Sequence, residues 1–166
     1  ASPAGDDSPR FFPVPAVTDW TQPLHPLIVH FPIGLLVSAA AVDIASLAAR
    51  PTSALRHAAT GLYVAGALAL VAAYFSGRAD AAALRVPGMA HAVIDAHWTW
   101  ALRTTVYFGA LTLGRAGLAV SGYVAPRRIW IPFVASGVLG LALLFQTAER
   151  GGRLVYEHGV AVAAPR

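Results

Sequence analysis

The stretch LHPLIVHFPIGLL, residues 24–36, opens a long apolar run with two histidines and two prolines. Apolar runs normally exclude groups that are costly to dehydrate, and a histidine inside lipid usually marks a functional residue. The prolines stand in the first turns, where a helix does not need their missing N–H groups. The stretch therefore predicts a membrane helix that carries His25 and His30 at its mouth.

The composition of the whole chain is that of a membrane protein. Of its 166 residues, 57% are hydrophobic and 12% are charged, and the mean hydropathy is +0.60. These values are too apolar for a soluble domain. At about 20 residues per crossing, four stretches are long enough to span a bilayer: residues 27–49, 57–76, 90–114 and 129–148.

Four spans with short connections predict an all-α, integral membrane four-helix bundle of up-down-up-down topology. The membrane domain covers residues 24–162 in this interpretation. The proline- and aspartate-rich residues 1–23 are expected to form an extended surface tail, and residues 163–166 a short C-terminal tail. Gly151 and Gly152 are expected to end the fourth helix, so that the C-terminal segment folds over one end of the bundle.

Several classes of function are disfavoured. The arginines stand singly at span ends, where flanking basic residues belong, so the basic charge does not indicate nucleic-acid binding. The absence of cysteine excludes disulfides, thiolate zinc sites and covalent c-type haem. No catalytic triad, phosphate loop or HExxH motif indicates a hydrolase or NTPase. We expect an electron-transfer or structural subunit rather than an enzyme.

The alternation of the spans brings most of the histidines to one end of the bundle. The residues expected there are His25, His30, His91, His97 and His158, whereas His57 falls at the other end. Three uses of such a cluster are open: axial ligation of a haem iron by two helices, binding of Zn or Cu, and proton relay. The alternative is that the histidines only hydrogen-bond neighbouring backbone.

Depth along the helices favours one pair within this cluster. At about 1.5 Å per residue, His30 lies one turn inside the first span and His97 two turns inside the third. His25 and His91 lie nearer the rim, where His25 is expected to bond backbone, a propionate or water. We therefore expect His30 and His97 to face each other across the bundle diagonal, with room for one haem between them.

Asp43 and Arg103 are the ionisable residues that fall well inside the predicted spans. Opposite charges at similar depth predict a buried structural ion pair.

The motifs resemble DUF2231, a bacterial family of predicted four-span membrane proteins. The resemblance rests on LHPLIVHFPIGLL, on Asp43 and His97, and on the closing GGRLVYEHGVAV (151–162), and it covers residues 24–162. His25, His30, His97 and His158 occupy motif positions, whereas His91 is peculiar to this sequence. The resemblance implies membrane redox chemistry, because such proteins often accompany cytochrome c or Rieske-type domains; here these would be separate subunits.

The leading hypothesis is a haem-b-binding electron-transfer subunit of a larger redox or photosynthetic complex, with bis-histidine ligation near the outer face. The alternatives are a haem-free structural or assembly subunit, and a Zn or Cu site at the same histidines. The loop arginines favour the end opposite the histidines as cytoplasmic. The histidine cluster and both termini are thus expected on the periplasmic side of the bacterial inner membrane.

Overall fold

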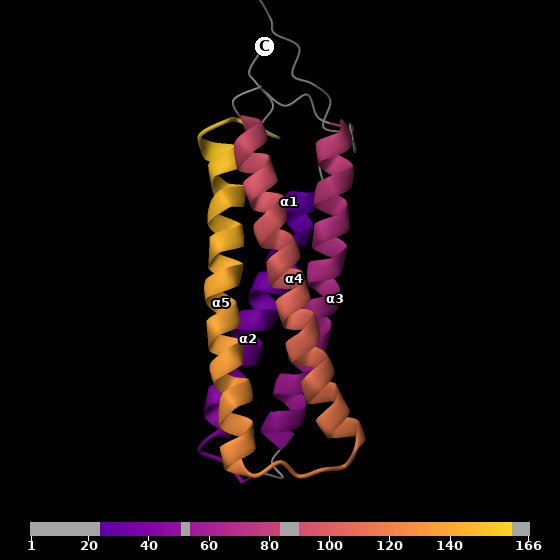
Figure 1. The fold of residues 1–166 in the computed structure, drawn as a ribbon, viewed down its shortest axis with the longest axis vertical. Coiled ribbons are helices and arrows are strands. Elements are labelled where there is room, and N and C mark those ends of the chain that lie inside the picture. The colour runs from indigo at the N-terminus through magenta and orange to yellow at the C-terminus, as the bar shows by residue number, and fades with distance from the viewer. Residues whose placement is uncertain (1–23, 51–53, 84–89, 161–166) are drawn as a thin grey trace, which may run out of the picture.

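The computed structural model describes residues 24–50, 54–83 and 90–160, and the predicted tails 1–23 and 163–166 lie outside these residues. The chain is all-α. Its elements are α1 (His25–Ile28), α2 (His30–Ser46), α3 (Ala54–Ala83), α4 (His91–Val120) and α5 (Arg127–Tyr156). The long helices run up and down alongside one another, and the α4–α5 connection lies at the end opposite the last turn of α5 (Figure 1).

Helices α1 and α2 together form the first predicted span. Val29 lies between them with helical dihedral angles, φ −62° and ψ −22°. Pro32 has no N–H group to donate to the carbonyl of Ile28, so the hydrogen-bond ladder is interrupted while the chain keeps its direction. The residues His25–Ser46 are apolar and long enough to act as one membrane span.

The four long helices form a ring in which neighbours in sequence pack together. Helix α2 packs against α3 and α5, and α4 packs against α3 and α5, so α2 and α4 lie on a diagonal. The predicted all-α bundle is therefore confirmed. The segments His25–Ser46, Ala54–Ala82 and Arg127–Tyr156 have the length and apolar composition of membrane spans. A crossing by the more polar α4 stays a prediction.

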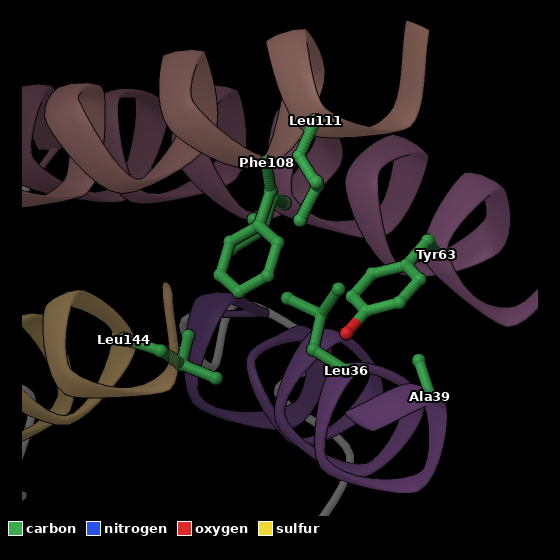
Figure 2. Close-up of a cluster of buried hydrophobic side chains, with 7 residues drawn as sticks. Leu36, Ala39, Tyr63, Phe108, Leu111 and Leu144 are labelled. Atoms are coloured by element: carbon green, nitrogen blue, oxygen red, sulfur yellow. The ribbon is translucent and has the colours of Figure 1, made fainter. Parts of the chain in front are cut away.

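The centre of the bundle is a cluster of large side chains from all four long helices (Figure 2). Glycines make room for these side chains, as the small residues of the sequence predicted. A Cβ atom on Gly66 would lie 2.6 Å from Leu36 Cδ2, and one on Gly140 would lie 2.6 Å from Phe108 Cζ. These contacts allow α2 to approach α3, and α4 to approach α5, closely enough to exclude lipid between them.

The outer surface of the bundle is apolar. Within each candidate span only 28–33% of the residues are buried inside the chain. The large exposed side chains include Leu68, Phe75, Leu113 and Phe145. Such a surface is suited to lipid rather than to water.

Two expected boundaries are wrong. Helix α5 continues through Gly151 and Gly152 and ends after Tyr156, near Gly159, whose φ of +63° is left-handed. Helix α3 extends to Ala83, seven residues beyond the predicted span 57–76. Beyond the end of α5, the N–H of Val160 donates to the carbonyl of Leu154 at 2.9 Å, and both side chains pack near Ile94 of α4.

Candidate functional site

His25 and His97 face each other across the diagonal of the bundle. His25 begins α1, and His97 lies in the second turn of α4. Their ring centroids are 6.2 Å apart, and the ring planes are inclined by 80°. Two imidazoles from diagonal helices therefore meet inside one end of the bundle.

The ring of His25 is held by α3. Its Nδ1 lies 3.1 Å from Ser76 Oγ, and Ser76 donates its own hydroxyl proton to the carbonyl of Ala73 at 3.0 Å. Since that proton is already engaged, Ser76 Oγ accepts from Nδ1–H of His25. The backbone N–H of His25 donates to Asp80 Oδ2 at 2.9 Å. The tautomer that results leaves Nε2 of His25 with a lone pair.

The ring of His97 is held in the same way by α5. Its Nδ1 lies 3.0 Å from the carbonyl oxygen of Thr147, which can only accept a hydrogen bond. Nδ1 of His97 therefore carries the proton, and Nε2 keeps its lone pair. Thr147 is in turn linked to α4, because its hydroxyl lies 2.8 Å from that of Thr104. Both imidazoles are thus fixed in the form in which histidine binds metals.

Each imidazole also lies against a glycine of the helix that holds it. A Cβ atom on Gly77 would lie 2.9 Å from Cε1 of His25, and one on Gly151 would lie 3.2 Å from Cε1 of His97. Gly151 therefore makes room for a ring and does not unwind the helix. The sequence interpretation missed Ser76, Gly77 and Thr147.

A cavity of about 430 Å³ surrounds the two histidines. Its walls come from all four long helices and α1, and they are mostly apolar; Val29, Ile33, Leu70, Ile94, Leu144 and Leu154 are among the lining residues. Cavities of roughly 300–1,000 Å³ with apolar walls and few polar groups are typical of cofactor and ligand sites.

His30 does not take the position that the sequence predicted for it. It is among the residues that line the cavity, but its side chain is exposed, as is that of Phe31, which is 67% exposed. Five residues along an α-helix correspond to a rotation of about 140°, so the side chains of His25 and His30 leave the helix in different directions. His25 is the partner that the structure places beside His97.

The remaining histidines lie away from this pair. His91 begins α4 and is exposed, and His158 follows α5 and is partly buried; neither is among the residues that line the 430 Å³ cavity. His57 lies near the start of α3, at the opposite end of the bundle, as the sequence predicted. A haem-ligand role for His25, His30, His91, His97 or His158 stays a prediction.

The predicted ion pair between Asp43 and Arg103 is wrong. Asp43 pairs with Arg115, through two hydrogen bonds of 2.8 and 2.9 Å. Arg103 is exposed and lies over the ring of Trp100, 5.4 Å from its centroid. The third predicted span ended at residue 114, which placed Arg115 in a loop, whereas α4 continues to Val120 and buries it.

Within the described residues, no group of three or more His, Cys, Asp or Glu side chains is arranged to hold a metal ion. A Zn or Cu site with three protein ligands therefore has no ligand set in that part of the chain. A porphyrin iron requires only two protein ligands, since the macrocycle supplies the others.

A family model described as a predicted membrane protein, DUF2231, matches residues 21–164. No curated protein and no solved structure matches the chain.

Proposed function

Since this chain belongs to the DUF2231 family of predicted membrane proteins, we propose that it is a membrane electron-transfer subunit that binds one haem b through His25 and His97. His25 replaces His30 as the first-helix ligand. The observation that carries the proposal is the meeting of two oriented imidazoles, from diagonal helices, inside an apolar cavity.

The separation of the two rings fits a shared metal. Bonds from metals to imidazole nitrogen are about 2.0 Å long, so two imidazoles on opposite sides of one ion have centroids about 6 Å apart. The rings of His25 and His97 are 6.2 Å apart. Their Nδ1 atoms are both occupied by hydrogen bonds, which leaves the Nε2 atoms for coordination.

The residues around the pair suit a macrocycle. The cavity walls are largely apolar, which favours a flat hydrophobic ligand. Arg78 and Arg150 belong to the same end, where they lie over Trp98 and Trp100 at 4.9 and 4.8 Å. These guanidinium groups are suited to neutralise propionates.

His25 and His97 would hold the haem, which would supply one-electron transfer without an open position for a substrate. Ser76 and Thr147 fix the tautomer and direction of each imidazole, and such hydrogen bonds would tune the redox potential of the site. The electron donor and acceptor would be separate redox subunits at the histidine end, which we place on the periplasmic side.

The alternative function is structural. The hydrogen bonds of His25 and His97 already join α1 to α3 and α4 to α5, so these histidines would hold the bundle together without any cofactor. Under this structural alternative, neither imidazole binds iron.

The experiment is a reduced-minus-oxidised absorption spectrum of the protein purified from membranes, together with a titration of the purified protein with hemin. We expect a sharp α-band of low-spin haem b and saturation at one haem per chain. A protein without the band that also fails to take up hemin would support the structural alternative.

A further inference from the structure

A second cavity, of about 150 Å³, lies at the end of the bundle opposite the histidine pair. Arg56, His57 and Thr60 of α3, Arg115 of α4 and Trp130 of α5 line it, together with the α4–α5 connection. Its volume is several times the roughly 15 Å³ that one ordered water requires. The cavity therefore has room for a small polyatomic ligand.

The charges beside this cavity do not balance. Arg115 is fully buried and Arg56 is 5% exposed. Both oxygens of Asp43 are engaged by Arg115. Arg56 donates Nη1–H to the neutral carbonyl of Ala125 at 2.7 Å. Two buried guanidinium groups thus face one carboxylate, and a buried charge without a counterion is costly.

The two guanidinium groups also keep unused donors. The buried Nε atoms of Arg56 and Arg115 have no hydrogen-bond partner among the described residues. Both groups lie over the ring of Trp130, at 4.7 and 4.4 Å from its centroid. The aromatic contact holds the arginines in place but does not satisfy their N–H groups.

The surroundings add further positive charge. In the described part of the chain, Asp43 is the acidic residue of this end, because the others lie toward the histidine end. The basic residues of this end also include the exposed Arg50, Arg127 and Arg128. No carboxylate of the described residues is therefore left to neutralise Arg56.

We propose that this cavity binds a phosphate-type oxyanion, supplied either by the headgroup of an anionic phospholipid or by free phosphate. The planar guanidinium fork matches phosphate oxygens and forms strong charge-assisted hydrogen bonds with them. The cavity lies beside the connection between α4 and α5, where spans meet the headgroup layer. The bound anion supplies the missing negative charge beside Arg56 and Arg115.

The test uses the full chain, purified in an uncharged detergent and freed of lipid. Its melting temperature is measured with inorganic phosphate, against chloride at equal ionic strength, and with phosphatidylglycerol, against phosphatidylcholine. We expect an increase with at least one of the two anionic probes, because a ligand that binds only the folded state stabilises it. Phosphate alone identifies a free oxyanion, and phosphatidylglycerol alone identifies a lipid headgroup.

Variants of Arg56 test whether the increase in melting temperature arises from binding in this cavity. Arg56→Gln removes the surplus charge and leaves the Asp43–Arg115 pair in place, so it should abolish the increase, whereas Arg127→Gln at the same end should keep it. Arg56→Lys keeps the charge without the planar fork and should bind at least about tenfold more weakly than wild type, which allows a test if Arg56→Gln folds poorly. No increase with either probe, or an unchanged increase in both Arg56 variants, would overturn the proposal.

Discussion

Asp43 accepts one hydrogen bond from Arg115 on each of its carboxylate oxygens, and both side chains are fully buried. The pair joins the diagonal helices α2 and α4 at the end opposite the histidines. At the other end of the bundle, His25 of α1 and His97 of α4 meet in the same way, between the first and third predicted spans.

Breaking this pair should be costly. Asp43→Asn leaves the guanidinium groups of Arg56 and Arg115 buried without a carboxylate, so we expect it to lower the free energy of unfolding by about 3–5 kcal/mol. Arg115→Met should be less damaging, and the double variant less damaging than Asp43→Asn alone. The measurement is thermal unfolding in detergent, with Arg103→Met as the control that should change little. Additive losses in the double variant would contradict the pairing.

Substitution of the glycines beside the two histidines should change haem binding without lowering the stability of the fold. Alanine in place of glycine inside a helix usually stabilises the helix, by up to about 1 kcal/mol. At Gly77 the new methyl group would displace the ring of His25, and at Gly151 that of His97. Gly77→Ala and Gly151→Ala should therefore keep the melting temperature of the haem-free protein and lower the haem content. Gly61→Ala, where a methyl group meets nothing within 4 Å, should preserve both.

The inclination of the two rings predicts a spectroscopic signature. The imidazole planes of His25 and His97 are 80° apart. Low-spin ferric haem with nearly perpendicular axial imidazoles gives a strongly anisotropic electron paramagnetic resonance signal with a large maximal g value. We expect this signal in the oxidised protein. A rhombic low-spin signal, typical of parallel planes, would show that the rings rotate on binding or that other residues coordinate the iron.

The orientation of the protein is open to direct labelling, since the chain has no cysteine. Glu157→Cys reports on the histidine end, and Val124→Cys, at a position that is 54% exposed in the α4–α5 connection, reports on the other. An impermeant maleimide should label Glu157→Cys in intact spheroplasts and Val124→Cys only after lysis. The reverse pattern would place the histidine end in the cytoplasm.

The spacing of residues along each helix predicts which face of the helix is turned toward the interior of the bundle. His25 and Asp43 are eighteen positions apart, as are His97 and Arg115, and eighteen residues make about five full turns. With Asp43 as the marker of the buried face, His25 falls on that face and His30 lies about 140° away from it. Counting depth from each helix start selected His30, which is on another face of its helix. It also selected Arg103, which lies twelve residues from Arg115, about 18 Å along α4.

The anchors of the imidazoles were less accessible from the sequence. Ser76 is the last residue of the predicted span 57–76, whereas α3 continues to Ala83, so Ser76 lies well inside the helix. Which residue of α5 faces His97 depends on the rotation of that helix, and this rotation is set by contacts such as Gly140 against Phe108. The apolar stretches of the sequence located the long helices, and their alternation placed His25 and His97 at one end of the bundle, but neither pattern gives these contacts between helices.

The ratio of haem to protein in purified single-histidine variants tests the central claim most directly. His25→Ala and His97→Ala should each lose the bound haem and the α-band, because each removes one axial imidazole of the pair. His30→Ala should retain the full haem content, since that side chain lies on the exposed face of the helix. Full haem content in His25→Ala, or its loss in His30→Ala with His25 intact, would contradict the assignment of His25 and His97 as the ligand pair.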